Sequence, residues 1–171
     1  MARPAVKIIV VDTNTFIAAG WRVNAHARRV LAAVARRRFQ LAVWSAILDE
    51  YRGVSQQPRF SGKNYSGLLA WIEKYALVVE PAPLGKARSR DPKGDIFLAC
   101  ALAANAKFIV SGDQDLLTLG KPFGIEIIQP AQFMCAISFD LRRENASIFA
   151  GRQFYQYAAV ALRVGIQTPS A

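Results

Sequence analysis

Acidic side chains are the residues of this chain whose types and spacing could do chemistry. The sequence holds 12 acids against 22 lysines and arginines, and seven of these acids fall in four short clusters. The clusters adjoin apolar runs and lie at Asp12, at Asp49 and Glu50, at Asp91 and Asp95, and at Asp113 and Asp115. Carboxylates gathered in one place repel each other unless they share a cation or protons. The clustering therefore predicts a site that holds a positive ion.

Four of these carboxylates, those of Asp12, Glu50, Asp95 and Asp113, are predicted to meet at one edge of a parallel sheet. In such a sheet, binding sites form at the carboxyl ends of the strands, where neighbouring crossovers diverge. Oxygen ligands of this kind suit Mg2+ or Mn2+, which prefer carboxylates and retained waters. One or two such ions could orient and deprotonate a water for in-line attack on a phosphodiester. The pattern therefore favours hydrolysis of nucleic acid.

Each acid also has a structural explanation that needs no metal. Asp12 fits a helix cap or a turn residue. Asp95 fits the cap of the apolar helix that follows it. Glu50 on a helix would ordinarily be solvated and paired with Arg52 or Lys74, and Asp113 fits a plain turn. The metal hypothesis depends on their joint occurrence at one predicted edge, in a chain that is poor in acids elsewhere.

Short apolar runs alternate with helical patterns along the chain and predict the elements that would position these acids. The β-branched run at 7–11 has the pattern of a strand buried on both faces, and a polar turn follows it at 12–15. Further strands are expected at 40–44, 77–79, 108–110 and 125–128, and helices at 25–38, 45–54, 65–75, 96–106 and from Pro130. Alternating strands and helices predict a right-handed parallel sheet covered on both faces. The expected fold class is α/β, a three-layer α/β/α sandwich with a mainly parallel five-stranded sheet.

Length and composition fit one basic domain. The chain has 171 residues, of which 53% are hydrophobic, enough to bury a core. Its formal net charge of +10 favours polyanionic partners, although a merely basic protein would carry the same charge.

Cys100 and Cys135 lie in apolar runs without paired spacing, which predicts reduced core residues. The apolar segment near the N-terminus is too short for a signal peptide or a membrane span, so we expect a cytoplasmic protein with no membrane partner.

The apolar pattern loosens towards the C-terminus. We expect residues 1–137 to form the domain and residues 138–171 to form a C-terminal extension. The extension is basic on balance and carries several aromatic residues. It is therefore either helical, packed on the domain or on a second subunit, or partly disordered.

Four short runs, taken together and in order, resemble the motifs of PIN-domain nucleases. They are VDTN at 11–14, LDEY at 48–51, RDPKGDIFLA at 90–99 and SGDQDLL at 111–117. Each run alone is a weak signal, whereas all four at suitable spacing over residues 6–136 are a strong one. The runs look in particular like the branch that includes VapC-like toxins of bacterial toxin–antitoxin pairs.

The resemblance implies a set of site residues and partners. Its site residues would be Asp12, Glu50, Asp95 and Asp113 as catalytic metal ligands, Asp115 as a further metal ligand, and Asn14 and Ser111 as supporting polar residues. It also implies Mg2+ or Mn2+ as the cofactor, RNA as the substrate, a homodimer, and a neutralising antitoxin that inserts near the active groove. Related chains often have more acid and a lysine around Asp95, whereas this chain has Gly94 and Ile96.

Basic residues near the third acidic cluster could bind the substrate. Lys86, Arg88 and Arg90 precede Asp95 in a loop, and we expect them to contact the phosphate backbone of a nucleic acid. A second group of arginines lies on the helix expected at 25–38, where a solvated helix face explains them equally well.

Other enzyme classes lack residues that they require. Asn14 stands where a dehalogenase-like phosphatase needs a second acid, and no glycine-rich phosphate loop occurs. His26 is the single histidine, so a serine or cysteine triad has no base. The expected function is a metal-dependent endoribonuclease, the toxin of a toxin–antitoxin pair. The alternatives are a non-catalytic nucleic-acid-binding module of the same fold and a structural or interaction domain.

Overall fold

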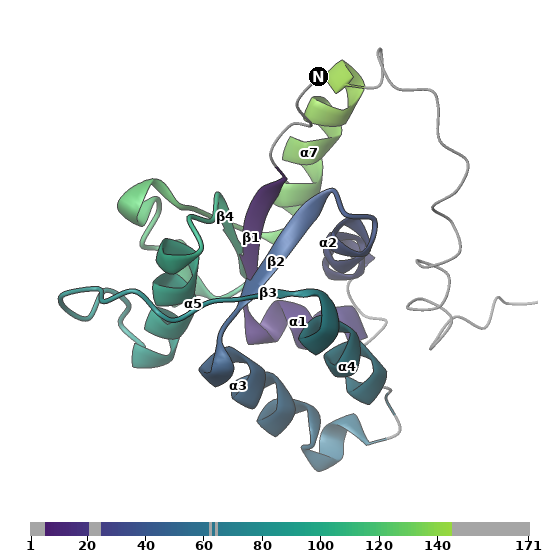
Figure 1. Ribbon diagram of the computed structural model, residues 1–171, viewed down its shortest axis with the longest axis vertical. Coiled ribbons are helices and arrows are strands. Elements are labelled where there is room, and N and C mark those ends of the chain that lie inside the picture. The colour runs from purple at the N-terminus through teal and green to yellow at the C-terminus, as the bar shows by residue number, and fades with distance from the viewer. Residues whose placement is uncertain (1–5, 21–24, 62, 64, 145–171) are drawn as a thin grey trace, which may run out of the picture.

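Residues 6–20, 25–61, 63 and 65–144 are described by the computed structural model. Strands and helices alternate along this part of the chain (Figure 1). In chain order the elements are β1 (Lys7–Val11), α1 (Thr13–Gly20), α2 (Ala25–Ala35), β2 (Phe39–Val43), α3 (Ser45–Ser55), η1 (Pro58–Phe60), α4 (Tyr65–Tyr75), β3 (Leu77–Val78), α5 (Pro92–Ala103), β4 (Phe108–Val110), α6 (Gln114–Leu117), η2 (Pro122–Gly124), β5 (Glu126–Ile128) and α7 (Pro130–Glu144).

The five strands of the described chain form one parallel sheet. Their order is β3-β2-β1-β4-β5, and each neighbouring pair runs parallel. The central strand β1 is fully buried at Ile9, Val10 and Val11. Branched apolar side chains suit a strand that is covered on both faces. The predicted α/β/α sandwich with a five-stranded parallel sheet is therefore confirmed.

Helices cover both faces of the sheet. In Figure 1, α5 lies to the left of the central strands, and α2 and α4 lie to the right. Both layers contribute apolar side chains to the core, since Phe97 and Leu98 of α5 and Val30 and Leu31 of α2 are buried. Helices therefore cover both faces of the central strands, whereas Leu77 and Val78 of the edge strand β3 are exposed.

The two cysteines lie in different environments. Cys100 on α5 is fully buried, and burial raises the pKa of its thiol to about 12, so it stays protonated. Cys135 on α7 is exposed, so its predicted place in the core was wrong. Phe133 and Ile137 of α7 are buried, four residues apart on one side of the helix, and residue 135 lies between them on another side.

Three phenylalanine rings pack together where α7 contacts the amino ends of β2 and β4. The ring of Phe133 is fully buried, and its centre lies 5.1 Å from that of Phe39 and 5.4 Å from that of Phe108. Tilted and edge-to-face arrangements of this kind are favourable for aromatic pairs. Phe39 begins β2 and Phe108 begins β4. Helix α7 therefore packs at the amino ends of the strands, opposite their carboxyl ends (Figure 1).

Helix α1 replaces the polar turn expected at 12–15. The helix begins at Thr13, and the side chain of Asp12 accepts a hydrogen bond from the Thr15 N–H at 2.7 Å. The carbonyl of Asp12 accepts the next bond, from the Phe16 N–H at 2.9 Å, and the Phe16 ring is fully buried. Capping by the acid and burial of the apolar face outweigh the low helix propensity of threonine and asparagine.

Helix α5 begins earlier than the predicted start at residue 96. Its N-cap is Asp91, whose side chain accepts a hydrogen bond from the Lys93 N–H at 3.0 Å. Pro92 follows as the first helical residue, a position that suits proline because the missing N–H is not needed there. Asp95 lies in the first turn, so the explanation that it caps this helix is wrong.

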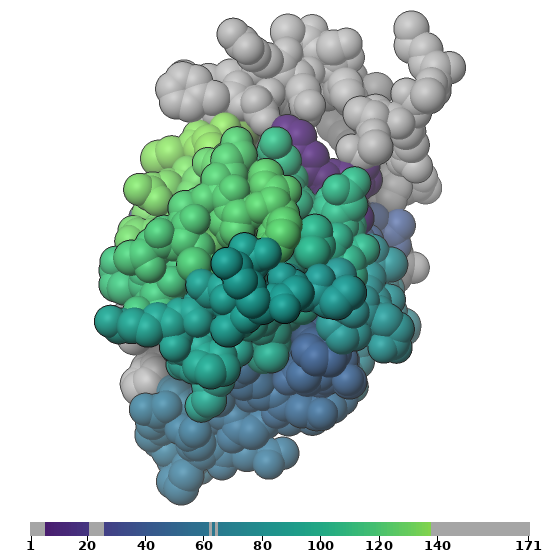
Figure 2. Space-filling view, turned by 90° about the vertical axis from the view of Figure 1, so that its left-hand side faces the viewer, coloured from purple at the N-terminus to yellow at the C-terminus, as the bar shows by residue number. Residues whose placement is uncertain are grey.

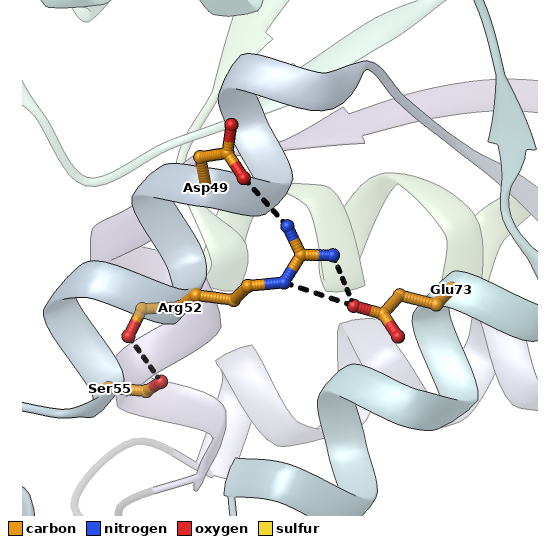
Figure 3. A network of polar contacts seen from close by, with 4 residues as sticks. All are labelled: Asp49, Arg52, Ser55 and Glu73. Carbon is orange, nitrogen blue, oxygen red and sulfur yellow. Dashed lines mark hydrogen bonds and ion pairs between the residues drawn. The ribbon is translucent and has the colours of Figure 1, made fainter.

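Arg52 connects α3 to α4 at the surface (Figure 3). Its guanidinium pairs with Asp49 on its own helix at 2.7 Å and with Glu73 on α4 at 2.5 Å. The Ser55 hydroxyl donates to the Arg52 carbonyl at 3.0 Å. Arg52 thus pairs with Asp49 and Glu73, and the expected pairing of Glu50 with Arg52 is wrong. Exposed ion pairs of this kind contribute little to stability.

Helix α7 runs across the expected domain end at residue 137 and reaches the last described residue, Glu144. Residues 145–171 of the expected extension lie outside the described residues. In the part of the chain that the structure describes, no helix has the length and apolar character needed to cross a membrane.

Candidate active site

The strand order of the sheet reverses between β1 and β4, and two predicted site residues lie at that point. Asp12 directly follows β1, and Ser111 directly follows β4. The register pairs Val11 with Val110, and the Asp12 N–H donates to the Val110 carbonyl at 3.1 Å. Open parallel sheets bind ligands outside the carboxyl ends of their strands at such a reversal. The candidate site is therefore centred on Asp12 and Ser111.

Asp12 is a buried carboxylate, with 2% of its surface exposed. Its Oδ1 accepts from the Thr15 N–H at 2.7 Å, and its Oδ2 accepts from the Ser111 hydroxyl at 2.6 Å. Burial raises the pKa of Asp12, the hydrogen bonds from Ser111 and Thr15 oppose that rise, and the charge of Asp113 adds to it. The protein alone therefore compensates the charge of Asp12 incompletely, and a nearby cation would favour its ionised form.

Ser111 joins Asp12 to Asp113. The buried Ser111 hydroxyl donates to Asp12 and accepts from the Asp113 N–H at 2.9 Å. Asp113 in turn caps α6, because its Oδ1 accepts from the Asp115 N–H at 2.7 Å. The polar segment after β4 is therefore a hydrogen-bonded chain that links the Asp12 carboxylate to the backbone of Asp113 and orients the Asp113 carboxylate towards α6.

Tyr51 supports the backbone next to Asp12. Its ring stacks on that of Phe16, with centres 4.2 Å apart and planes 6° apart, and its hydroxyl donates to the Val11 carbonyl at 2.6 Å. Burial raises the pKa of Tyr51 well above its usual value, and the charges of Asp12 and Glu50 add to the rise. The hydroxyl therefore keeps its proton and holds the end of β1 in place.

Glu50 and Asn14 come from the helices that follow β2 and β1. Glu50 is half-buried on α3, close enough to Tyr51 for its charge to raise the pKa of that hydroxyl. Asn14 is exposed in the first turn of α1. Glu50 thus lies on the Tyr51 side of the candidate site, whereas Asn14 faces solvent.

Asp95 is held by the loop that precedes α5. Its carboxylate accepts from the Ser89 N–H at 2.7 Å and from the Arg88 N–H at 3.0 Å and 3.2 Å. The adjacent Gly94 packs so closely that a Cβ there would lie 2.6 Å from the Ser89 Oγ and 3.1 Å from Leu116 Cδ2. Close packing therefore explains why residue 94 is a glycine, and Asp95 orders the loop in this arrangement.

The predicted substrate-binding cations Lys86, Arg88 and Arg90 are all exposed in this loop. The guanidinium of Arg90 pairs with Asp115 at 2.7 Å, and that of Arg88 lies 5.0 Å from the centre of the Phe123 ring. Figure 2 faces this side of the molecule, where the teal loop lies beside the green segment that follows α6. The arginines of α2 lie on the other side of the sheet (Figure 1), so the two basic groups do not form one surface.

The described residues contain no group of three or more acidic, histidine or cysteine side chains placed to hold a metal ion. Asp12 and Asp113 are linked through Ser111, whereas Asp95 accepts from loop amides and Asp115 pairs with an arginine. Mg2+ is commonly bound through one or two carboxylates and retains several waters. The donor chemistry of Asp12 and Asp113 therefore fits a two-carboxylate Mg2+ or Mn2+ site, and the participation of the other acids stays a prediction.

Three contributors to the site were missed by sequence reasoning. Tyr51 lies in the run at 48–51, and the need of a buried tyrosine hydroxyl for an acceptor could have indicated its role. The Thr15 N–H lies three residues after Asp12, which is the spacing of an N-cap bond. Ser89 has no local signal, because its contact with Asp95 depends on the path of the loop.

Comparison with known proteins agrees with this geometry. Residues 8–115 match the PIN domain family, a range that begins in β1, ends in α6 and includes the five predicted acidic ligands. No curated protein matches the chain. The family match covers more than half of the 171 residues. Together with the parallel sheet, it shows that the chain belongs to the PIN domain family, whose members are generally nucleases.

Proposed function

We propose that this protein is a metal-dependent endoribonuclease that hydrolyses phosphodiester bonds in RNA. The observation that carries the proposal is the hydrogen-bonded link from Asp12 through Ser111 to Asp113, at the reversal of strand order. Two carboxylates held together where open parallel sheets bind their ligands suit a divalent cation and a phosphodiester. The catalytic unit of the proposal is residues 1–137, with residues 138–171 as an extension.

The acids of the site have separate roles in this proposal. Asp12 and Asp113 would hold Mg2+ or Mn2+, with Glu50, Asp95 and Asp115 as further ligands. The bound ion would lower the pKa of a coordinated water and offset charge on the phosphodiester. Because Asp12 is buried, its carboxylate gains more from a neighbouring cation than an exposed one would. Asp95 also keeps the basic loop in position through the loop amides.

The basic loop supplies the contacts to RNA. Lys86, Arg88 and Arg90 are exposed, and the loop adjoins Asp95 through backbone hydrogen bonds. Cations in this position would bind phosphates on either side of the cleaved bond and hold the strand against the acids. The net charge of +10 adds a long-range attraction for any polyanion. RNA binding should therefore weaken steeply as salt is raised.

We further propose that the protein is the toxin of a toxin–antitoxin pair, acting in the cytoplasm as a homodimer and neutralised by a cognate antitoxin. The resemblance of the four motifs to the VapC-like branch of PIN domains supports this proposal. A neighbouring, overlapping gene for a small DNA-binding protein would favour it, and co-expression of that protein should relieve growth arrest. Light scattering in solution tests the homodimer, because a mass of one chain would contradict it.

The nuclease proposal is tested by cleavage of a single-stranded RNA. Asp12→Asn and Asp95→Asn should abolish Mg2+-stimulated cleavage, because each removes a ligand charge, while thermal unfolding shows an intact fold. Asp49→Asn is the matched control, since Asp49 is an exposed acid on α3 whose carboxylate pairs with Arg52 (Figure 3). It should cleave like the wild type. Equal cleavage by the wild type and both site variants would refute the assignment.

A non-catalytic nucleic-acid-binding module is the second candidate. It is favoured by the present partners of two acids, since Asp95 accepts from loop amides and Asp115 pairs with Arg90. Calorimetric titration with Mn2+ separates the two functions. A nuclease site should give saturable heat that Asp12→Asn loses, whereas a pure binder should retain RNA affinity and give no such heat. RNA binding that does not weaken with salt would instead indicate a structural or interaction domain.

A further inference from the structure

Phe123 exposes an aromatic ring from a backbone conformation that few side chains adopt. It lies in η2 with φ of 54°, in the left-handed region, and 49% of its surface is exposed. A phenylalanine in this place costs conformational energy and forgoes most of the gain from burial. Strain at an exposed ring points to a role in binding rather than in folding.

The ring of Phe123 lies against the loop that holds Asp95. The guanidinium carbon of Arg88 is 5.0 Å from the ring centre, within the range of a cation–π contact. The backbone N–H of Arg88 donates to Asp95, and its Nη2 donates to the Leu84 carbonyl at 3.3 Å. A single residue therefore connects this ring to an acid of the proposed nuclease site.

A hollow of about 290 Å³ adjoins Phe123 at the C-terminal end of α5. Its walls include Leu102 from α5, and Asn105 and Lys107 from the segment that leads to β4. Asn105 and Lys107 are both exposed. Leu102 comes seven residues after Asp95 on the same helix, a rise of about 10 Å. The hollow thus combines an aromatic ring, an amide and an ammonium group, and its Leu102 wall lies about 10 Å along α5 from Asp95, with Asn105 and Lys107 beyond the end of the helix.

We infer that this hollow binds a nucleobase of single-stranded RNA, with Phe123 as the stacking platform. The inference rests on the proposed function and deepens it, because the base would belong to a nucleotide that flanks the phosphodiester at the acids. Aromatic side chains stack on any base, since every base has a π-face. The Asn105 amide can bond to a base edge, and Lys107 and Arg88 can contact phosphates.

The ring, and not the charges around it, favours RNA over a polyanion that has no bases. Lys93, Lys107 and Lys121 are exposed, in addition to the cations of the loop. A polyanion without bases would use the same cations but would gain nothing from a flat ring. Inorganic polyphosphate therefore serves as the contrasting probe.

The test measures equilibrium binding of a short fluorescein-labelled single-stranded RNA in EDTA, where metal-dependent cleavage does not proceed. Phe123→Leu keeps apolar bulk and removes the ring, whereas Phe123→Tyr keeps the ring. The leucine variant should raise the Kd for RNA about tenfold, in line with the loss of one stacked base, and the tyrosine variant should bind like the wild type. Competition with polyphosphate should give the same affinity for all three proteins.

Tyr75→Leu is the matched control. Tyr75 ends α4, is 44% exposed, and has the Lys74 ammonium 5.3 Å from its ring centre, so it is another exposed ring beside a cation. This variant should bind RNA like the wild type. The inference is overturned by an unchanged RNA affinity of Phe123→Leu, by equal weakening in Tyr75→Leu, by an equal loss of polyphosphate affinity, or by a wild type that binds no RNA. The nuclease proposal is tested separately, by measuring whether Asp12→Asn loses RNA cleavage.

Discussion

The hydroxyl of Ser111 donates a 2.6 Å hydrogen bond to Oδ2 of Asp12, although the two residues are 99 positions apart in the sequence. They meet because β1 and β4 are parallel neighbours and each residue directly follows its strand. The same hydroxyl accepts from the Asp113 N–H at 2.9 Å. One buried side chain thus links the Asp12 carboxylate to the backbone of Asp113, which makes Ser111 a positioning residue in the proposed metal site.

Ser111→Ala should loosen this pair without removing either carboxylate. We expect Mn2+ affinity and RNA cleavage to fall about 10- to 100-fold, the usual range for residues that orient metal ligands. The free energy of unfolding should fall by about 1–3 kcal/mol, because Asp12 and the Asp113 N–H lose a buried partner. Calorimetric titration and urea unfolding measure the two effects.

The control for this variant is Ser55→Ala, which removes a hydroxyl bonded to the Arg52 carbonyl within α3 (Figure 3). Its effect on stability should stay within about 0.5 kcal/mol, and its metal affinity should match the wild type. If Ser111→Ala binds Mn2+ as tightly as Ser55→Ala does, the positioning role is wrong.

Asp12 should make stability depend on pH in the opposite direction to an ordinary paired carboxylate. Burial is the main reason that its pKa is raised in the folded state. Its stabilising contribution is therefore complete below the unfolded-state pKa and is lost as pH rises through the folded-state pKa. Asp12→Asn cannot ionise, so in EDTA it should have a higher Tm than the wild type at neutral pH. Circular dichroism during heating should show this difference closing in acid.

Divalent cations provide the internal check on that pH dependence. Mg2+ or Mn2+ should raise the Tm of the wild type at neutral pH and leave that of Asp12→Asn unchanged, because only the ionised carboxylate gains from the ion. A wild type that becomes more stable than the variant as pH rises in EDTA would contradict the raised pKa.

Two tyrosines offer a matched comparison of support for the site. The Tyr51 hydroxyl donates to the Val11 carbonyl at 2.6 Å, and the Tyr65 hydroxyl donates to the Ile17 carbonyl at 2.8 Å. Replacing either by phenylalanine should lower the free energy of unfolding by about 1 kcal/mol. Only Tyr51 holds the residue before Asp12, so only its variant should also lower kcat, by about tenfold, with little change in KM. Equal kcat values for the two variants would count against this role.

A side chain at residue 94 should disturb the loop that holds Asp95. A Cβ at Gly94 would lie 2.6 Å from the Oγ and 2.9 Å from the Cβ of the buried Ser89, whose N–H is the nearest partner of Asp95. We expect Gly94→Ala to lower the free energy of unfolding by about 1–3 kcal/mol, as overpacking does, and to reduce RNA cleavage. Urea unfolding and the cleavage assay measure these effects.

Gly53→Ala provides the contrast, because a Cβ at that position of α3 would meet nothing within 4 Å. Alanine suits a helix better than glycine, so this variant should raise the free energy of unfolding by about 0.5–1 kcal/mol. Two alanine variants of equal stability would show that the close approach at Gly94 is not a constraint.

The strands and the general position of the site could be predicted from the sequence. Strands β1 and β4 are short apolar runs with clear ends, and both have the expected bounds. Once such runs alternate with helices, parallel pairing places the residues that follow them at one edge. The juxtaposition of Asp12 and Ser111 therefore follows from local patterns and a general rule of sheet topology.

Helix starts and loop contacts could not be predicted, because they depend on tertiary contacts. Helix α1 forms against the propensity of its first residues, since Phe16 and Ile17 become buried. The apolar pattern of α5 begins only at Ile96, whereas the helix starts after its cap at Asp91. The bonds from the loop amides to Asp95 depend on an irregular path that has no periodic signal. The directions of the acidic side chains could therefore not be read from the sequence.

Phe133 packs against the first residues of β2 and β4, at the end of the sheet remote from Asp12. The contacts that anchor α7 and the candidate site therefore lie at opposite ends of the same strands. Evolution could therefore change the segments that follow the strands, and with them the molecules that are recognised, while the sheet and its packing against α7 stay the same. Mutations of Phe133 should consequently lower the abundance of folded protein in the cell rather than change which molecules it recognises.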